Sequence, residues 1–264
     1  MDILARIQGK PNSGKEAFAK LLDRGSLTIE GKLNGRDVQY HSIVDLKRHH
    51  LQAAIIDITE NRLVREGFEY TASALARAAE AHDELTGDHL VRMNSYSNKL
   101  AEILDCNLNF IKDLTLLAQL HDVGKVHIEQ KIITKEGSLT TAEYDKMKRH
   151  SLFGAKIIGD HPKLALARQI ALGHHERWDG TGYPYGLSGE MIPFPAQIVA
   201  VADVFDALVS KRSYKPAFDY DQTYKIMSNG DSRLDPQKHF NPRILKVFIK
   251  NFDIFTWIHS RFKG

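Results

Sequence analysis

The chain carries histidines and aspartates of the types that hold metal ions in proteins. A histidine offers one lone pair to a cation and a carboxylate can bridge two, so this set exceeds the needs of one ion and fits two transition metals. Cys106 is the only cysteine, which excludes a thiolate site. The candidate ligands are His89, His121, Asp122, His150, His174, His175 and Asp203.

A glycine- and proline-rich stretch directly follows the adjacent pair His174–His175 and ends at Pro184. Together with the other ligand segments it resembles the HD-GYP domains, bacterial phosphodiesterases of cyclic di-GMP within the HD phosphohydrolase superfamily. The resemblance runs from Thr86 to the C-terminal region. Its segments are Thr86-Gly87-Asp88-His89, His121-Asp122-Val123-Gly124-Lys125, Met147-Lys148-Arg149-His150, Val201-Ala202-Asp203, Lys211-Arg212-Ser213-Tyr214-Lys215 and His239-Phe240-Asn241-Pro242.

The resemblance implies a division of the ligands between two divalent transition metals. Asp122 is expected to bridge the ions, with His89, His121 and Asp203 on one side and His150, His174 and His175 on the other. Fe or Mn is favoured, and Zn, Co and Ni are further candidates. Neighbouring residues on a regular helix diverge by about 100°. His174 and His175 can therefore reach the same ion only if their helix ends there.

Cationic side chains near the ligands are candidates for contacts to phosphate. Lys125 follows His121–Asp122 closely in the chain, and the resemblance adds Arg212 and Lys215. We expect Glu176 to hydrogen bond a ligand histidine. Arg177, Asp179 and Tyr183 belong to the signature loop and are expected to shape contacts to substrate or to a protein partner.

Two metals of this kind support attack of a metal-bound hydroxide on a phosphodiester, and Asp122 and Lys125 are the residues we place in the catalytic machinery. The resemblance implies cyclic di-GMP as substrate, with pGpG and then GMP as products. Hydrolysis of cyclic GMP-AMP remains an alternative, because no base-reading residue can be identified. A weakly active module that binds cyclic dinucleotides or docks proteins is a third reading, although a complete ligand set favours an enzyme.

Two positions depart from the family pattern. Some members carry a glutamate four residues before the first histidine and use it for a third metal, but this chain has Leu85 there. We therefore predict two metals. Ser213 stands where the family usually has proline, which affects the rigidity of the segment from Arg212 to Lys215.

Apolar residues recur every three or four positions from about Glu60 onward, which predicts a mainly α fold with an HD-type helical bundle. Asn107 and the pair Thr140 and Glu143 are expected to cap helices, and the helix after Thr140 is expected to continue past His150. The predicted domains are a small α+β region at 1–60, a connecting signalling helix at 61–85 and a catalytic domain at 86–264.

The first 60 residues contain three predicted strands at 27–30, 37–40 and 53–56, with a turn at Asn34–Gly35 between the first two. The exit from this region into the long helix resembles that of a PAS sensor domain. The helix at 61–82 is a candidate for homodimer formation through pairing with a copy of itself. The Gly-Tyr-Pro loop is a candidate surface for a protein partner.

Composition agrees with a soluble enzyme, for which we expect a cytoplasmic location, and the resemblance implies a role in bacterial second-messenger signalling. The chain has 36 Lys and Arg against 33 Asp and Glu, so general affinity for DNA or RNA duplexes is not predicted. No apolar run is long enough to span a membrane, and the first residues lack a signal-peptide core. The resemblance implies a cyclic dinucleotide as the partner, and no membrane association is predicted.

Overall fold

The structure is a computed structural model that describes Ile7 and residues 13–45, 47–48, 50–81, 87–211 and 217–262. It divides into two compact units, Met1–Tyr70 and Thr71–Gly264. The long helix α3 (Thr59–Glu80) crosses the boundary between them. The domain limits expected from the sequence therefore stay a prediction.

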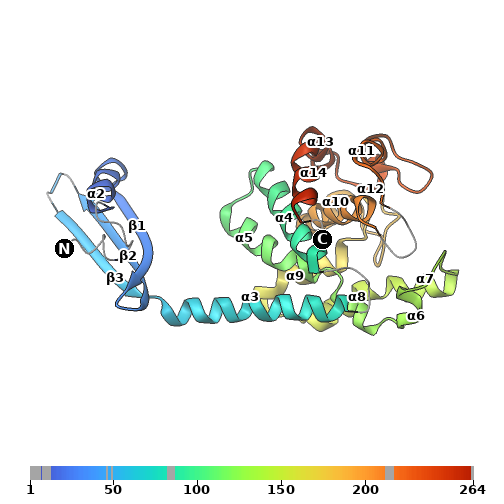
Figure 1. Cartoon of the computed structure of the whole chain (residues 1–264), viewed down its shortest axis with the longest axis horizontal. Coiled ribbons are helices and arrows are strands. Elements are labelled where there is room, and N and C mark those ends of the chain that lie inside the picture. Colours follow the sequence, from blue (N-terminus) through green and yellow to red (C-terminus); the bar gives the residue numbers. More distant parts are fainter. Residues whose placement is uncertain are drawn as a thin grey trace. The chain divides into compact units, whose positions relative to one another are not determined.

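The N-terminal unit contains helix α2 (Ser13–Arg24) and an antiparallel sheet of order β1-β2-β3, as Figure 1 shows. Asn34 and Gly35, with φ of 51° and 80°, form the two-residue turn that joins β1 to β2 and confirm the predicted hairpin. The strands are longer than predicted, and helix α2 was not expected. Their bounds are Ser26–Leu33 for β1, Arg36–Asp45 for β2 and His50–Asp57 for β3.

The second unit is the predicted helical bundle (Figure 1). Short 3-10 helices connect several of its α-helices and place residues at sharp turns. Its α-helices are α4 (Gly87–Ile103), α5 (Leu108–Leu117), α6 (Gln130–Ile133), α7 (Thr141–Lys148), α8 (His150–Ile158), α9 (Ala165–Gly173), α10 (Phe194–Val209), α11 (Tyr220–Asn229), α12 (Pro236–His239), α13 (Pro242–Lys250) and α14 (Phe252–Arg261). Its 3-10 helices are η1 (Ala118–Leu120), η2 (Val123–His127), η3 (Pro162–Leu164) and η4 (Gly189–Met191).

Helix α10 forms the centre of the bundle. Pro195 stands in its first turn, where the missing amide hydrogen costs nothing. Val199, Val201 and Phe205 are fully buried against residues of α4, α9, α13 and α14. A helix that is apolar on nearly all sides lies inside the protein. Helix α10 is therefore held in place by the core around it, and a polar residue on this helix has a fixed position.

The predicted caps are confirmed. The Asn107 side chain accepts a hydrogen bond from the backbone of Phe110, and Thr140 and Glu143 form a reciprocal capping box. The single helix expected through His150 is instead two helices, α7 and α8, which meet at Arg149. The Arg149 amide donates a hydrogen bond to the Lys146 carbonyl, three residues earlier, which tightens the turn. The Nδ1 atom of the His150 ring donates to the Met147 carbonyl.

No helix in the described ranges has the length and apolar character needed to cross a lipid bilayer.

Candidate metal centre

All of the seven candidate ligands except Asp203 lie at the ends of helices or in turns. His89 lies in the first turn of α4, His150 opens α8, and Asp203 lies within α10. His121 and Asp122 occupy the turn between η1 and η2. Helix α9 ends at Gly173, so His174 and His175 follow the regular helix and are not forced apart by its geometry.

The structure brings these residues together in two groups. In each group, the ligand atoms lie within 4.8 Å of one another. We call the first the His89 group, made of His89, His121 and Asp203. We call the second the Asp122 group, made of Asp122, His150, His174 and His175. Each group has enough nitrogen and oxygen donors for one divalent cation.

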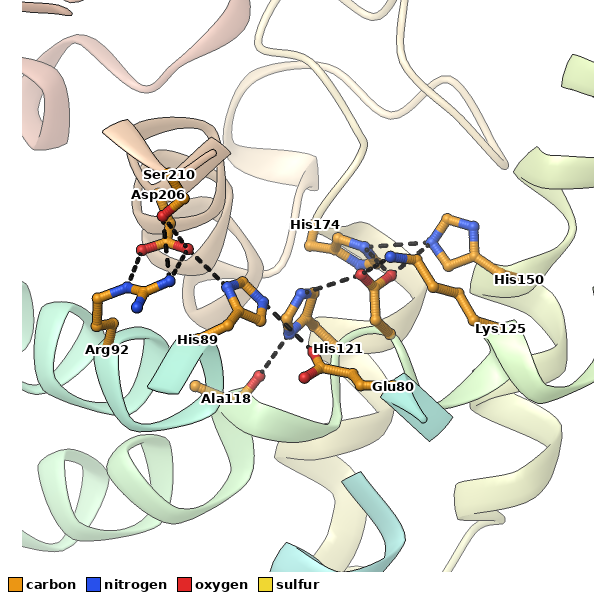
Figure 2. Close-up of polar contacts among 11 residues, drawn as sticks. Glu80, His89, Arg92, Ala118, His121, Lys125, His150, His174, Asp206 and Ser210 are labelled. Atoms are coloured by element: carbon orange, nitrogen blue, oxygen red, sulfur yellow. Dashed lines mark hydrogen bonds and ion pairs between the residues drawn. The ribbon is translucent and has the colours of Figure 1, made fainter. Parts of the chain in front are cut away.

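Each buried ligand histidine has its outer nitrogen beside a hydrogen-bond acceptor, and Figure 2 shows this for His89 and His121. The Nδ1 atoms of His121, His150 and His174 lie 3.0, 2.7 and 3.0 Å from the backbone carbonyls of Ala118, Met147 and Ile170. A carbonyl can only accept, so each Nδ1 carries a hydrogen and each Nε2 presents a lone pair when the ring is neutral. This arrangement is typical of metal-ligating histidines.

The Nε2 atoms point at the carboxylate of Asp122. His150 and His174 lie 3.2 and 3.6 Å from Oδ1, and His121 lies 3.3 Å from Oδ2. The Nε2 atoms of His150 and His174 are 3.4 Å apart. Facing lone pairs repel one another, and a cation placed among them would turn that repulsion into coordination.

Unpartnered polar atoms at the centre fit a metal site. Within the described part of the chain, the buried atoms His89 Nε2, His121 Nε2 and Asp122 Oδ1 have no hydrogen-bond partner. Buried polar atoms are normally paired because leaving them unpaired is costly. The donor set present here therefore suits divalent metals.

The charges of the cluster shift the pKa values of its members. Burial raises the pKa of Asp122, but Lys125 and the neighbouring imidazoles outweigh it and hold that pKa well below its ordinary value. Burial lowers the pKa of His174. Burial and the neighbouring His174 lower the pKa of His175. Both shifts favour neutral rings. For His121, Asp122 outweighs burial and raises the pKa to about 9. A metal ion would displace the proton from His121.

Asp206 supports His89, a role that the sequence analysis did not assign. Its Oδ2 accepts from His89 Nδ1 at 2.7 Å, and Arg92 donates to both carboxylate oxygens at 2.7 and 3.0 Å. Burial raises the pKa of Asp206, but the hydrogen bonds from His89 and Arg92 lower it more. Asp203 and Asp206 are three residues apart on α10, a spacing that places both on one helix face and could have revealed the role.

Glu80 is a second residue that the sequence analysis missed. It is the last residue of α3, is only 4% exposed, and places Oε1 3.4 Å from His89 Nε2. Figure 2 shows its carboxylate beside the rings of His89 and His121. Its place in the sequence, outside the ligand motifs, gave no signal of this position.

Lys125 and Tyr183, two of the expected substrate contacts, lie beside the ligands. Lys125 Nζ is 2.8 Å from Asp122 Oδ2, and its side chain is 12% exposed. The Tyr183 ring centroid lies 4.7 Å from that of His175. Arg212 and Lys215 lie outside the described residues.

The expected role of Glu176 was wrong. Its two oxygens accept from the backbone amides of Tyr185 and Leu187, so it holds the signature loop and not a histidine. Asp179 is exposed, and its Oδ1 accepts from the amide and hydroxyl of Thr181 within the same loop. Arg177 lies in the same loop and is partly buried.

The close approach of η2 to α8 requires glycine. A Cβ on Gly124 would lie 1.9 Å from the His150 carbonyl oxygen and 2.3 Å from the Gly154 nitrogen. Only a residue without a side chain lets the turn that carries Asp122 pack this tightly against the helix that carries His150.

Comparison with known proteins gives the family. The family model described as "HD domain" matches residues 73–237. The chain belongs to the HD domain family. The match begins after the N-terminal sheet, so the PAS-like interpretation of that sheet stays a prediction.

Curated relatives and one solved structure agree with the HD-GYP resemblance. A Vibrio cholerae protein named cyclic di-GMP phosphodiesterase is 38% identical over 79% of this chain and 44% of its own length. The cyclic di-GMP phosphodiesterase response regulator RpfG of Xanthomonas campestris pv. campestris is 40% identical over 71% of this chain and 49% of its own length. The chain thus spans about half the length of these relatives. Bd1817, described as an HDG"Y"P protein from Bdellovibrio bacteriovorus, shares the fold at a TM-score of 0.50 and 20% identity, over 71% of this chain and 64% of that one.

Proposed function

We propose that the chain is a metal-dependent phosphodiesterase that hydrolyses cyclic di-GMP to pGpG and onward to GMP. One observation carries the proposal. Three buried histidines donate hydrogen bonds from Nδ1 to backbone carbonyls, and their Nε2 atoms all face the buried carboxylate of Asp122. Such an inward-facing set serves two cations, for which Fe or Mn is favoured over Zn, Co and Ni. The names of the relatives support cyclic di-GMP as the substrate.

The donors would be shared between two ions. Asp122 would bridge them, the His89 group would complete one coordination sphere, and His150, His174 and His175 would complete the other. Bound cations of this kind act as Lewis acids that lower the pKa of water and neutralise charge on a phosphodiester. The protein's part is to hold the donors rigidly, which the backbone hydrogen bonds of the rings achieve.

The substrate would approach the less buried side of the cluster. His175, Asp203, Lys125 and Tyr183 are partly exposed, whereas His89, His121, His150 and His174 are at most 2% exposed. The Lys125 ammonium lies 2.8 Å from Asp122 Oδ2 on this partly exposed side, where its positive charge would attract a phosphate oxygen. Arg212 and Lys215 would add positive charge to the phosphate site, and Arg177 and Tyr183 would border it.

Cyclic GMP-AMP is the second candidate substrate. A Vibrio cholerae protein named 3'3'-cGAMP-specific phosphodiesterase 2 is 35% identical over 75% of this chain and 37% of its own length. Among the residues we place at the cluster, none is positioned to distinguish adenine from guanine. A third candidate is a module that binds cyclic dinucleotides and docks a protein at the signature loop.

Metal content and turnover test these candidates in one experiment. The protein is purified without oxygen, its metals are quantified by element, and metal-free protein reloaded with Mn or Fe is incubated with each cyclic dinucleotide. We expect two metal ions per chain and faster hydrolysis of cyclic di-GMP. Faster hydrolysis of cyclic GMP-AMP would make that compound the substrate. Binding without hydrolysis by the fully loaded protein would favour the module that binds cyclic dinucleotides and docks a protein.

The proposed setting is cytoplasmic signalling by a homodimer formed through the 61–82 helix. Leu63 and Val64 of α3 are 62% and 65% exposed, which supplies apolar surface for pairing with a second copy. Light scattering measures the molecular mass of the full chain and of its Leu63→Asp variant, and we expect a dimer for the first and a larger share of monomer for the second. A monomeric wild-type chain at micromolar concentration would contradict it.

A further inference from the structure

We propose that Glu80 is a ligand of the metal ion in the His89 group, contributed by helix α3 from outside the ligand motifs. The inference rests on the proposed function, because it assumes that the cluster binds metal. Glu80 has a side chain that is 5% exposed, and neither of its carboxylate oxygens has a hydrogen-bond partner among the described residues. A buried carboxylate without hydrogen bonds either takes up a proton or is stabilised by a cation nearby.

The orientation of His89 defines what faces Glu80. His89 Nδ1 donates to Asp206 Oδ2 at 2.7 Å, and Arg92 pairs with the same carboxylate. The proton of a neutral ring is therefore on Nδ1, and Nε2 presents a lone pair. Glu80 Oε1 lies 3.4 Å from that nitrogen, a contact that Figure 2 marks with a dashed line and that has an ion-pair distance but not hydrogen-bond geometry. Two acceptors that face each other in a buried space are both satisfied by one metal ion.

Packing holds Glu80 in this place. Ala72, Ala76 and Glu80 follow one another at four-residue intervals and form a single buried stripe on α3. The alanines pack in a cluster with Leu90 of α4 and Leu117 of α5. These buried alanines fix the end of α3 in the apolar core, so the core and not a flexible surface segment holds the Glu80 carboxylate in place.

The ion of the His89 group can accept a further ligand. With Asp122 shared between the two ions, each would have four protein donors, and Mn prefers a higher coordination number than four. Leu85 occupies the position from which some family members supply a glutamate, so that source is lost here. Glu80 lies one turn of α3 beyond Ala76 and supplies a carboxylate from a different helix. The metal site would then include a residue of the helix that directly follows strand β3 in the chain.

The test compares Glu80→Gln with Glu66→Gln, a control on the exposed part of α3 whose partner is Arg62. Glutamine keeps the shape of glutamate but is a poor metal ligand. Metal content, the dissociation constant of each ion and the melting temperature with and without metal are measured for both variants. We expect Glu80→Gln to weaken one of the two ions by at least about tenfold, and Glu66→Gln to leave both unchanged.

Thermal unfolding separates ligation from a structural role. If Glu80 binds metal, the metal-free Glu80→Gln protein melts no lower than the wild type, while its stabilisation by metal is smaller. If Glu80 is only structural, the variant melts lower without metal and gains the full stabilisation from metal, which would overturn the inference.

Asp122→Ala distinguishes failure of this inference from failure of the proposed function. Unchanged affinity for both ions in Glu80→Gln, combined with metal loss in Asp122→Ala, overturns the role of Glu80 alone. Retention of both ions in Asp122→Ala means that the cluster is not the metal site, and both proposals then fall.

Discussion

The two donor groups of the candidate metal centre are built in different ways. In the Asp122 group, His150 and His174 are oriented by backbone carbonyls three and four residues earlier in the chain. In the His89 group, His121 is also oriented by a nearby carbonyl, that of Ala118. His89, however, is oriented by Asp206, which lies 117 residues later in the chain. The first group therefore depends on local helix geometry, whereas the second also depends on how α4 and α10 pack together. Changes in that packing should affect one ion and spare the other.

The largest effect is expected where the two groups meet. Asp122→Ala removes the carboxylate that faces three imidazoles and should abolish both metal retention and hydrolysis of cyclic di-GMP. Metal analysis and product chromatography measure these losses. Asp113→Ala, at an exposed position of α5, is the matched control and should behave as the wild type. Full activity in Asp122→Ala would disprove its bridging role.

A smaller loss should follow when the turn carrying Asp122 is pushed away from α8. Gly124→Ala places a methyl group against backbone atoms of His150 and Gly154 that cannot move aside cheaply. We expect a loss of about 1–3 kcal/mol in the free energy of unfolding, with a melting temperature lower by several degrees. The same substitution at Gly67, where a Cβ meets nothing within 4 Å on α3, should not destabilise the protein. Equal melting temperatures for the two variants would contradict this packing.

Asp206→Asn should separate the two groups. The substitution removes the charged acceptor of His89 Nδ1 and leaves Arg92 without its ion pair. Loss of such a supporting carboxylate typically weakens metal binding by about 10–100-fold, and we expect this for the ion of the His89 group only. Titration of metal-free protein should show one weakened and one unchanged ion. Equal weakening of both ions would show that the groups are not independent.

The smallest effect concerns His239, which belongs to neither group. Burial and Arg177 lower its pKa from 6.5 to about 4. The unfolded chain therefore binds more protons than the folded protein between these values, so this residue's contribution to stability is complete above pH 6.5 and is lost as the pH falls toward 4. Melting temperatures of metal-free protein at pH 5 and 7.5 should differ less for His239→Asn than for the wild type. An identical difference would mean that His239 does not titrate as described.

Much of the fold could be predicted because helix signals are local. The Asn107 cap and the box of Thr140 and Glu143 follow from residues within a few positions of one another. The break at Arg149 was missed because the apolar pattern continues across it. Helix α2 was missed although Ala17 and Leu21 recur at the four-residue spacing of one helix face.

The candidate site could be predicted where motifs carry the ligands. The structure brings together every ligand in the described residues that the family resemblance implied. Glu80 could not be found in this way, because its approach to His89 depends on the packing of Ala72 and Ala76 and leaves no pattern near the histidine. Glu176 was assigned wrongly because a glutamate beside two histidines suggests a contact that the turn of the chain prevents. Its carboxylate instead meets the amides of Tyr185 and Leu187.

The central claim is that these side chains surround two cations, and anomalous diffraction from crystals of the anaerobically Mn- or Fe-loaded protein tests it most directly. We predict two anomalous peaks, one within the His89 group and one within the Asp122 group, with the Asp122 carboxylate contacting both. Peaks at other places, or a cluster without any peak in protein that contains stoichiometric metal, would contradict the account.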